Sequence, residues 1–136
     1  MNIDKFRNDH AAIAGNVTEL ERLLKAGVAT NAESIARTIV AMSSTIKLHL
    51  AAEDRVLYPA LTAASKAATA QVALRFQNEM GAIAATYGEF SRRWNVGAKV
   101  AANPDGFRRE AGQIIKALSD RIRRENQELY PMAELV

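Results

Sequence analysis

Four stretches of the chain carry apolar residues at alternating intervals of three and four, a spacing that places them on one face of an α-helix. These stretches cover residues 3–26, about 31–65, about 67–101, and 103 onward. Because only short segments separate them, neighbouring helices are expected to run antiparallel. The pattern predicts an all-α fold, an up-down-up-down antiparallel four-helix bundle, formed by residues 1–136 as a single domain.

Local signals refine the ends of these helices. Gly27 is suited to the C-terminal stop of the first helix, and Asn103 and Pro104 to the cap and first position of the last. Pro59 is expected to bend or interrupt the second helix, and Gly97 to end the third helix early.

Six core-facing positions fall at one level of the predicted bundle. They lie early in the first and third helices and late in the second and fourth, so antiparallel packing brings them to the same end. In chain order they are His10, His49, Glu53, Met80, Arg121 and Glu125. Beyond them, the same spacing gives as the next core positions Val56 in the second helix and, in the fourth, Leu129 or Glu128 and then Met132.

The second and fourth helices share a sequence motif. His-Leu-Ala-Ala-Glu at residues 49–53 precedes Leu-Tyr-Pro at 57–59, and Arg-Ile-Arg-Arg-Glu at 121–125 precedes a second Leu-Tyr-Pro at 129–131. One helical turn separates His49 from Glu53, so imidazole and carboxylate project from one face and can hold one cation. In the second copy of the motif, arginine takes the place of that histidine.

Composition excludes several kinds of site and partner. The absence of cysteine rules out disulfides, thiolate metal ligands and iron–sulfur clusters, and it fits a cytoplasmic location. No apolar run reaches the roughly 18 residues that a transmembrane helix needs. A net charge of +3 is mild, so neither a nucleic-acid partner nor a membrane is expected.

A group of basic residues is expected at the end of the bundle opposite the polar cluster. It includes Arg92, Arg93, Arg108 and Arg109. These residues form either a solvated basic face or a docking surface for an anion or a protein.

The early Asp-His pair, the His-x-x-x-Glu turn and the later Glu-x4-Tyr-Pro turn resemble the hemerythrin-like, or HHE cation-binding, family of four-helix bundles. The resemblance covers nearly the whole chain. It implies a site in which two His-x-x-x-Glu/Asp turns, an early histidine and a third-helix histidine ligate two irons that bind dioxygen or sense oxygen, nitric oxide or iron level. The ligands that it implies here are His10, His49, Glu53 and Glu125.

Two positions depart from that family pattern. Met80 stands where the third-helix histidine is expected, and Arg121 where the fourth-helix histidine is expected. An iron pair needs several neutral imidazoles besides carboxylates, so the two changes remove most ligands of one metal position. The Arg121 guanidinium stays protonated and, placed between Glu53 and Glu125, would substitute electrostatically for the missing metal.

Three interpretations of the cluster are open. In the first, one metal ion binds to the four matched residues, a donor set acceptable to Fe(II), Mn(II) or Zn(II). In the second, the bundle holds no metal, and Arg121, the carboxylates and a histidine neutralise one another. In the third, less obvious groups complete a two-metal site; they are Glu79, Glu128 or Tyr87.

The sequence therefore predicts a small binding or sensing protein with a degenerate non-haem iron site that holds at most one iron or other divalent ion. Its partner would be a small diatomic ligand or another protein. The alternative is a metal-free family member that acts as a structural or protein-interaction module. Enzymatic activity is not expected, because the sequence contains no Ser/His/Asp set, phosphate-binding loop or complete oxygenase site.

Overall fold

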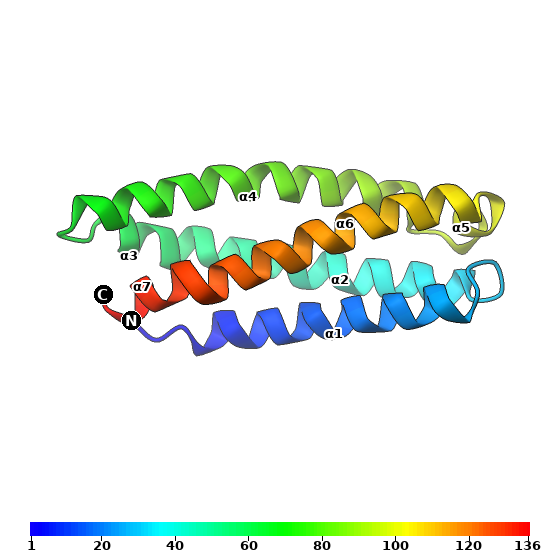
Figure 1. Ribbon diagram of the computed structural model, residues 1–136, viewed down its shortest axis with the longest axis horizontal. Helices are drawn as coiled ribbons and strands as arrows, with labels where there is room; N and C mark the ends of the chain where they lie inside the picture. The colour runs from blue at the N-terminus through cyan, green and yellow to red at the C-terminus, as the bar shows by residue number, and fades with distance from the viewer.

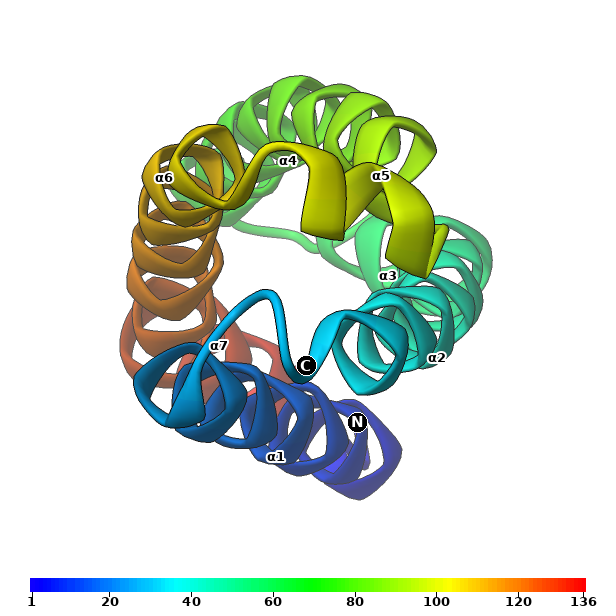
Figure 2. The same ribbon diagram turned by 90° about the vertical axis from the view of Figure 1, so that its right-hand side faces the viewer.

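The computed structural model describes residues 1–136, and every regular element in it is helical. The four long helices are α1 (Asp4–Ala26), α2 (Ala32–Ala52), α4 (Ala67–Trp94) and α6 (Pro104–Arg124). Figure 1 shows them side by side with alternating direction, and the end-on view in Figure 2 shows them arranged in a ring. The predicted up-down-up-down bundle is confirmed.

The second and fourth helices continue through a π-helical turn. η1 (Glu53–Leu57) and α3 (Tyr58–Thr62) extend α2, and η2 (Glu125–Leu129) and α7 (Tyr130–Glu134) extend α6. The amides of Tyr58 and Tyr130 donate to the carbonyls of Glu53 and Glu125, five residues back. The following proline lacks an N–H and cannot continue the α-helical hydrogen bonding. Instead of interrupting the second helix, Pro59 follows a π-turn, and the helix runs on to residue 62.

Each π-turn shifts the core-facing register by one residue, because it contains one residue more than an α-helical turn. Leu57 is fully buried, whereas Val56 has an exposed fraction of 51%. In the fourth helix Leu129 is buried as predicted, but Ala133 takes the core position predicted for Met132. The predictions for Val56 and Met132 are therefore wrong.

The expected end of the first helix and start of the last are confirmed, whereas Gly97, expected to end the third helix, instead begins the short helix that follows it. Gly27 follows α1 with a φ of 125°, in the region that favours glycine. The Asn103 side chain accepts a hydrogen bond from the Gly106 amide at 3.1 Å and caps α6. The third long helix ends at Trp94, and a short helix, α5 (Gly97–Ala102), follows and lies across the end of the bundle next to α2 (Figure 2).

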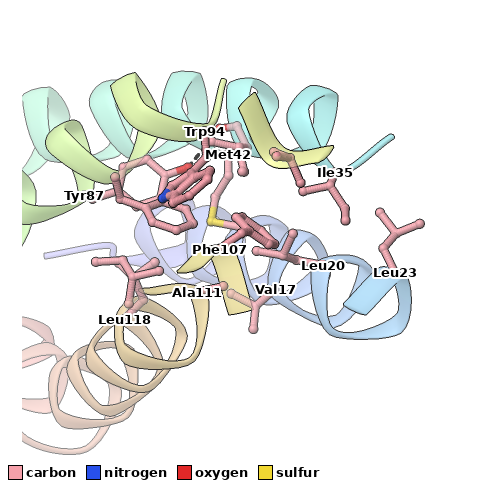
Figure 3. Close-up of a cluster of buried hydrophobic side chains, with 14 of the residues drawn as sticks. Val17, Leu20, Leu23, Ile35, Met42, Tyr87, Trp94, Phe107, Ala111 and Leu118 are labelled. Atoms are coloured by element: carbon pink, nitrogen blue, oxygen red, sulfur yellow. Dashed lines mark hydrogen bonds between the residues drawn. The ribbon is translucent and has the colours of Figure 1, made fainter. Parts of the chain in front are cut away.

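Two apolar clusters divide the core. The larger fills the half nearer α5, and Figure 3 shows its aromatic members Tyr87, Trp94 and Phe107 packed together. The smaller includes Phe6 and Phe76 and lies at the end where the termini meet. The helix positions between these clusters carry the five buried polar or charged residues, which are His10, His49, Glu53, Arg121 and Glu125. Met80, the sixth predicted position, is also buried and lies in α4 between Phe76 of the smaller cluster and Tyr87 of the larger. The sequence prediction that the six positions share one level is thus confirmed.

The basic residues at the α5 end are partly engaged in local contacts. Arg93 pairs with Glu110 at 3.0 Å, and the Trp94 indole N–H donates to the same carboxylate at 2.6 Å. Arg108 and Arg109 are exposed. A docking role for this face stays a prediction. None of the helices combines the length and apolar character that crossing a lipid bilayer requires.

Candidate metal centre

Four buried side chains from three helical segments converge on one point. His10 comes from α1, His49 and Glu53 from the end of α2 and the start of η1, and Glu125 from the start of η2. The two Nε2 atoms are 3.1 Å apart, His10 Nε2 is 2.9 Å from Glu125 Oε1, and His49 Nε2 is 3.2 Å from Glu53 Oε2. One nitrogen or oxygen from each residue lies within 4.8 Å of all the others. The structure brings all four predicted site residues together.

The outward-facing Nδ1 atom of each imidazole contacts an acceptor that the sequence did not predict. His10 Nδ1 lies 2.8 Å from Asn126 Oδ1, and His49 Nδ1 lies 3.1 Å from Asp9 Oδ2. Although burial opposes it, hydrogen bonds from Lys5 and His49 lower the pKa of Asp9, so this carboxylate stays anionic. With the Nδ1–H groups donating outward, the Nε2 atoms of both rings point into the centre.

Tyr130 also reaches the centre. Its hydroxyl donates to Glu53 Oε2 at 2.9 Å and lies 3.0 Å from His10 Nε2. Tyr130 follows Glu125 by five residues, about 1.4 turns of an α-helix, which would point it away from the core. The wider π-turn returns it to the inner face. The repeated Glu-x4-Tyr-Pro spacing was the one sequence signal of this contact.

The pKa values of the two cluster carboxyl groups shift in opposite directions. Burial raises the pKa of Glu53. Burial would also raise the pKa of Glu125, but hydrogen bonds from His10 and His49 and the charge of Arg121 outweigh it and lower that pKa. For His49, burial would lower the pKa, but hydrogen bonds to Glu125 and Glu53 raise it to about 10. In the absence of metal, His49 is therefore the protonated, positively charged imidazolium at neutral pH.

Arg121 fills the place beside the histidine centre. Its Nε donates to Glu125 Oε2 at 2.9 Å, and its Nη2 donates to the Phe76 carbonyl at 2.6 Å and to the Tyr58 hydroxyl at 3.2 Å. Its second acidic partner is Glu79, at 3.5 Å. The prediction that Arg121 lies between Glu53 and Glu125 is wrong for Glu53, because the long side chain extends toward α4 and meets Glu79 there.

Glu125 separates the two halves of the cluster. Its Oε1 faces His10 and its Oε2 faces Arg121. The guanidinium carbon lies 4.6 Å from the centroid of the Phe76 ring, so one face of the cation packs on an aromatic surface. The arginine is thereby fixed as a buried cation on the far side of Glu125 from the histidines.

The groups proposed to complete a two-metal site do not join the cluster. Tyr87 donates to the Ile39 carbonyl within the larger apolar cluster, and Glu128 is exposed. Glu79 contacts Arg121 and Arg124 instead of the histidines. Only the four-residue set around the histidines brings several candidate ligand atoms together.

The geometry of this set fits one metal ion. Ligand atoms bound to one ion at about 2.1 Å in neighbouring positions lie about 3.0–3.4 Å apart, close to three of the separations in the set, 2.9, 3.1 and 3.2 Å. Glu53 Oε1 is buried without any hydrogen-bond partner, a costly state that a cation would relieve. Two imidazoles with two carboxylates suit iron, manganese or zinc.

Comparison with known proteins agrees with this chemistry. The model of one protein family, described as the hemerythrin HHE cation-binding domain, matches residues 1–133. Searches of the curated proteins and of the solved structures gave no match.

Proposed function

Because the chain belongs to the hemerythrin HHE cation-binding domain family, we propose that its buried cluster binds one non-haem iron or other divalent ion. The proposed ligands are His10, His49, Glu53 and Glu125. When bound, iron supplies redox chemistry and a coordination position for a small diatomic ligand, so the proposed role is binding or sensing. We infer no catalytic role, because the polar groups of the cluster other than Glu53 Oε1, and the Arg121 donors, already have hydrogen-bond partners within the protein.

The main observation behind this proposal is that the imidazoles of His10 and His49 face each other. His10 and His49 bring their Nε2 atoms to 3.1 Å, while acceptors bind their Nδ1–H groups from behind. Two lone pairs at this distance repel unless a cation or a proton lies between them. Carboxylate or amide acceptors behind metal-binding histidines fix the ring orientation and raise the basicity of the ligand. This arrangement supports two histidine ligands that are ready for a metal.

A single ion is proposed instead of a pair because of Arg121. A guanidinium stays charged and repels a second cation at that side of Glu125. Glu53 and Glu125 balance one divalent ion, and Glu79 balances the arginine, which also contacts Glu125. The charges support one metal position and one permanent organic cation.

A second candidate function rests on the protonation of His49. Its pKa of about 10 means that a proton satisfies part of the cluster at neutral pH. Arg121 neutralises Glu125 at the same time. A metal-free bundle that acts as a structural or protein-interaction module is therefore the alternative.

Metal analysis separates these two functions. Protein produced in iron-supplemented medium is expected to contain roughly one metal ion per chain, and the His49→Ala variant is expected to contain almost none. Asp54→Ala removes an exposed carboxylate next to Glu53 and serves as a control that retains the metal. Wild-type protein that stays folded and metal-free in this medium would refute the metal site and favour the interaction module.

The acceptor behind His49 gives a second expected result. Asp9→Asn should lower metal affinity by about 10–100-fold, because outer carboxylates orient and polarise histidine ligands. The measurement is a competition titration against a chelator of known affinity. Asp4→Asn, which changes an exposed carboxylate on the same helix, should leave the affinity unchanged. Equal affinity of Asp9→Asn and wild type would show that this contact does not support a ligand.

A further inference from the structure

The phenolic oxygen of Tyr130 occupies the position of a further donor atom in the proposed site. It lies 3.0 Å from His10 Nε2, 3.5 Å from His49 Nε2 and 2.9 Å from Glu53 Oε2. These distances match the spacing of about 3.0–3.4 Å between atoms that share one metal ion. Three of the four proposed ligand atoms thus surround this oxygen at ligand-to-ligand distances.

Packing holds the Tyr130 ring in this position. The ring stacks on the His10 imidazole with centroids 4.9 Å apart and lies 6.0 Å from the ring of Phe6. The Arg7 guanidinium carbon lies 5.6 Å from its centroid. The side chain is fully buried. With the ring fixed by its neighbours, the hydroxyl stays beside the proposed ligand atoms.

We propose that Tyr130 is a fifth ligand, bound as a phenolate, when the site holds a trivalent ion such as Fe(III). This inference rests on the proposed single-metal site. In the binding step a metal–oxygen bond forms, the phenolic O–H bond breaks and the proton leaves to the buffer, with no change in the oxidation state of the metal. Bound cations favour the deprotonated form of a ligating group.

Charge balance explains why the phenolate belongs to the trivalent state. The carboxylates of Glu53 and Glu125 already neutralise a divalent ion, so that state has no need of a third anion. A trivalent ion with the same two carboxylates leaves one positive charge in a buried site, which is unfavourable unless it is compensated. The nearest group able to supply the negative charge is Tyr130, whose hydroxyl touches the proposed ligands.

The other copy of the motif provides a matched control. Tyr58 follows Glu53 by five residues, as Tyr130 follows Glu125, and both come directly after a π-turn. The Tyr58 hydroxyl accepts a hydrogen bond from Arg121 Nη2 at 3.2 Å. Tyr58 therefore faces the guanidinium side of the cluster, and Tyr130 faces the histidine side.

The test is to load metal-free protein with Fe(III) supplied as its citrate complex and to measure iron content, visible absorption and resonance Raman spectra. Wild type and Tyr58→Phe should bind iron and show a phenolate-to-iron charge-transfer band with phenolate ring modes. Tyr130→Phe should lose the band while retaining iron. The chain has three tyrosines, so the variant Tyr58→Phe/Tyr87→Phe keeps only Tyr130 and should retain the band.

The outcomes separate this inference from the proposed function. Iron-loaded wild type without the band, or a band that persists in Tyr130→Phe, would overturn the phenolate ligand and leave the metal site intact. Loss of the band in Tyr58→Phe/Tyr87→Phe would also overturn it, even if Tyr130→Phe does not fold. Wild type that takes up no iron would refute the proposed metal site and the phenolate with it.

Discussion

Replacing Arg121 by leucine is expected to lower the free energy of unfolding of the metal-free protein by about 3–5 kcal/mol, the cost of breaking a buried ion pair from one side. The substitution leaves Glu125, which is 2% exposed, without its guanidinium partner. It also leaves the Phe76 carbonyl and the Tyr58 hydroxyl without their donor. For a chain of this length the loss corresponds to a fall in Tm of roughly 10–17 °C. Thermal unfolding followed by circular dichroism in chelator measures it.

Two further variants make this result specific. Arg124 also contacts Glu79 and the Phe76 ring, but its side chain is 40% exposed, so Arg124→Leu should cost no more than about 1 kcal/mol. Adding Glu125→Gln to Arg121→Leu should restore part of the stability, because the uncompensated charge is then removed. A Tm of Arg121→Leu equal to that of wild type would show that the guanidinium does not neutralise the buried carboxylate.

The spacing of apolar residues by threes and fours predicted the fold because it marks the buried face of a helix, and each long helix of the bundle buries one such face. This spacing failed at Val56 and Met132, core positions whose assignment depends on the extra residue of a π-turn. A count of threes and fours assumes an unbroken α-helix and cannot detect an i→i+5 hydrogen bond. The proline after each tyrosine marked both places where this assumption fails, but it did not indicate the kind of turn.

The site was predictable to the extent that its residues lie on the core-facing stripes. His10, His49 and Glu125 do, and counting along antiparallel helices placed them at one level. Asp9 and Asn126 are the chain neighbours of stripe residues and reach the histidines from the side. Sequence periodicity assigns such residues to the surface, because it records where a residue sits on the helix and not how far its side chain extends.

Restoring both missing histidines gives the second large expected effect. Met80→His combined with Arg121→His is expected to raise the metal content from about one ion to about two per chain, since two imidazoles and two carboxylate oxygens then face a second position. One of these oxygens is Glu125 Oε2, which Arg121 binds in the native chain. The other would come from Glu53, shared between the two ions.

The single variant Met80→His shows whether the arginine itself excludes the second ion. It adds an imidazole to α4 but keeps the guanidinium bound to Glu125, Phe76 and Tyr58, so we expect it to remain at about one metal per chain. Metal content by elemental analysis after dialysis decides both cases. A double variant that still holds one ion would show that the second position lacks more than these two histidine ligands. A single variant that binds two ions would show that the charge of Arg121 does not limit this centre to one metal.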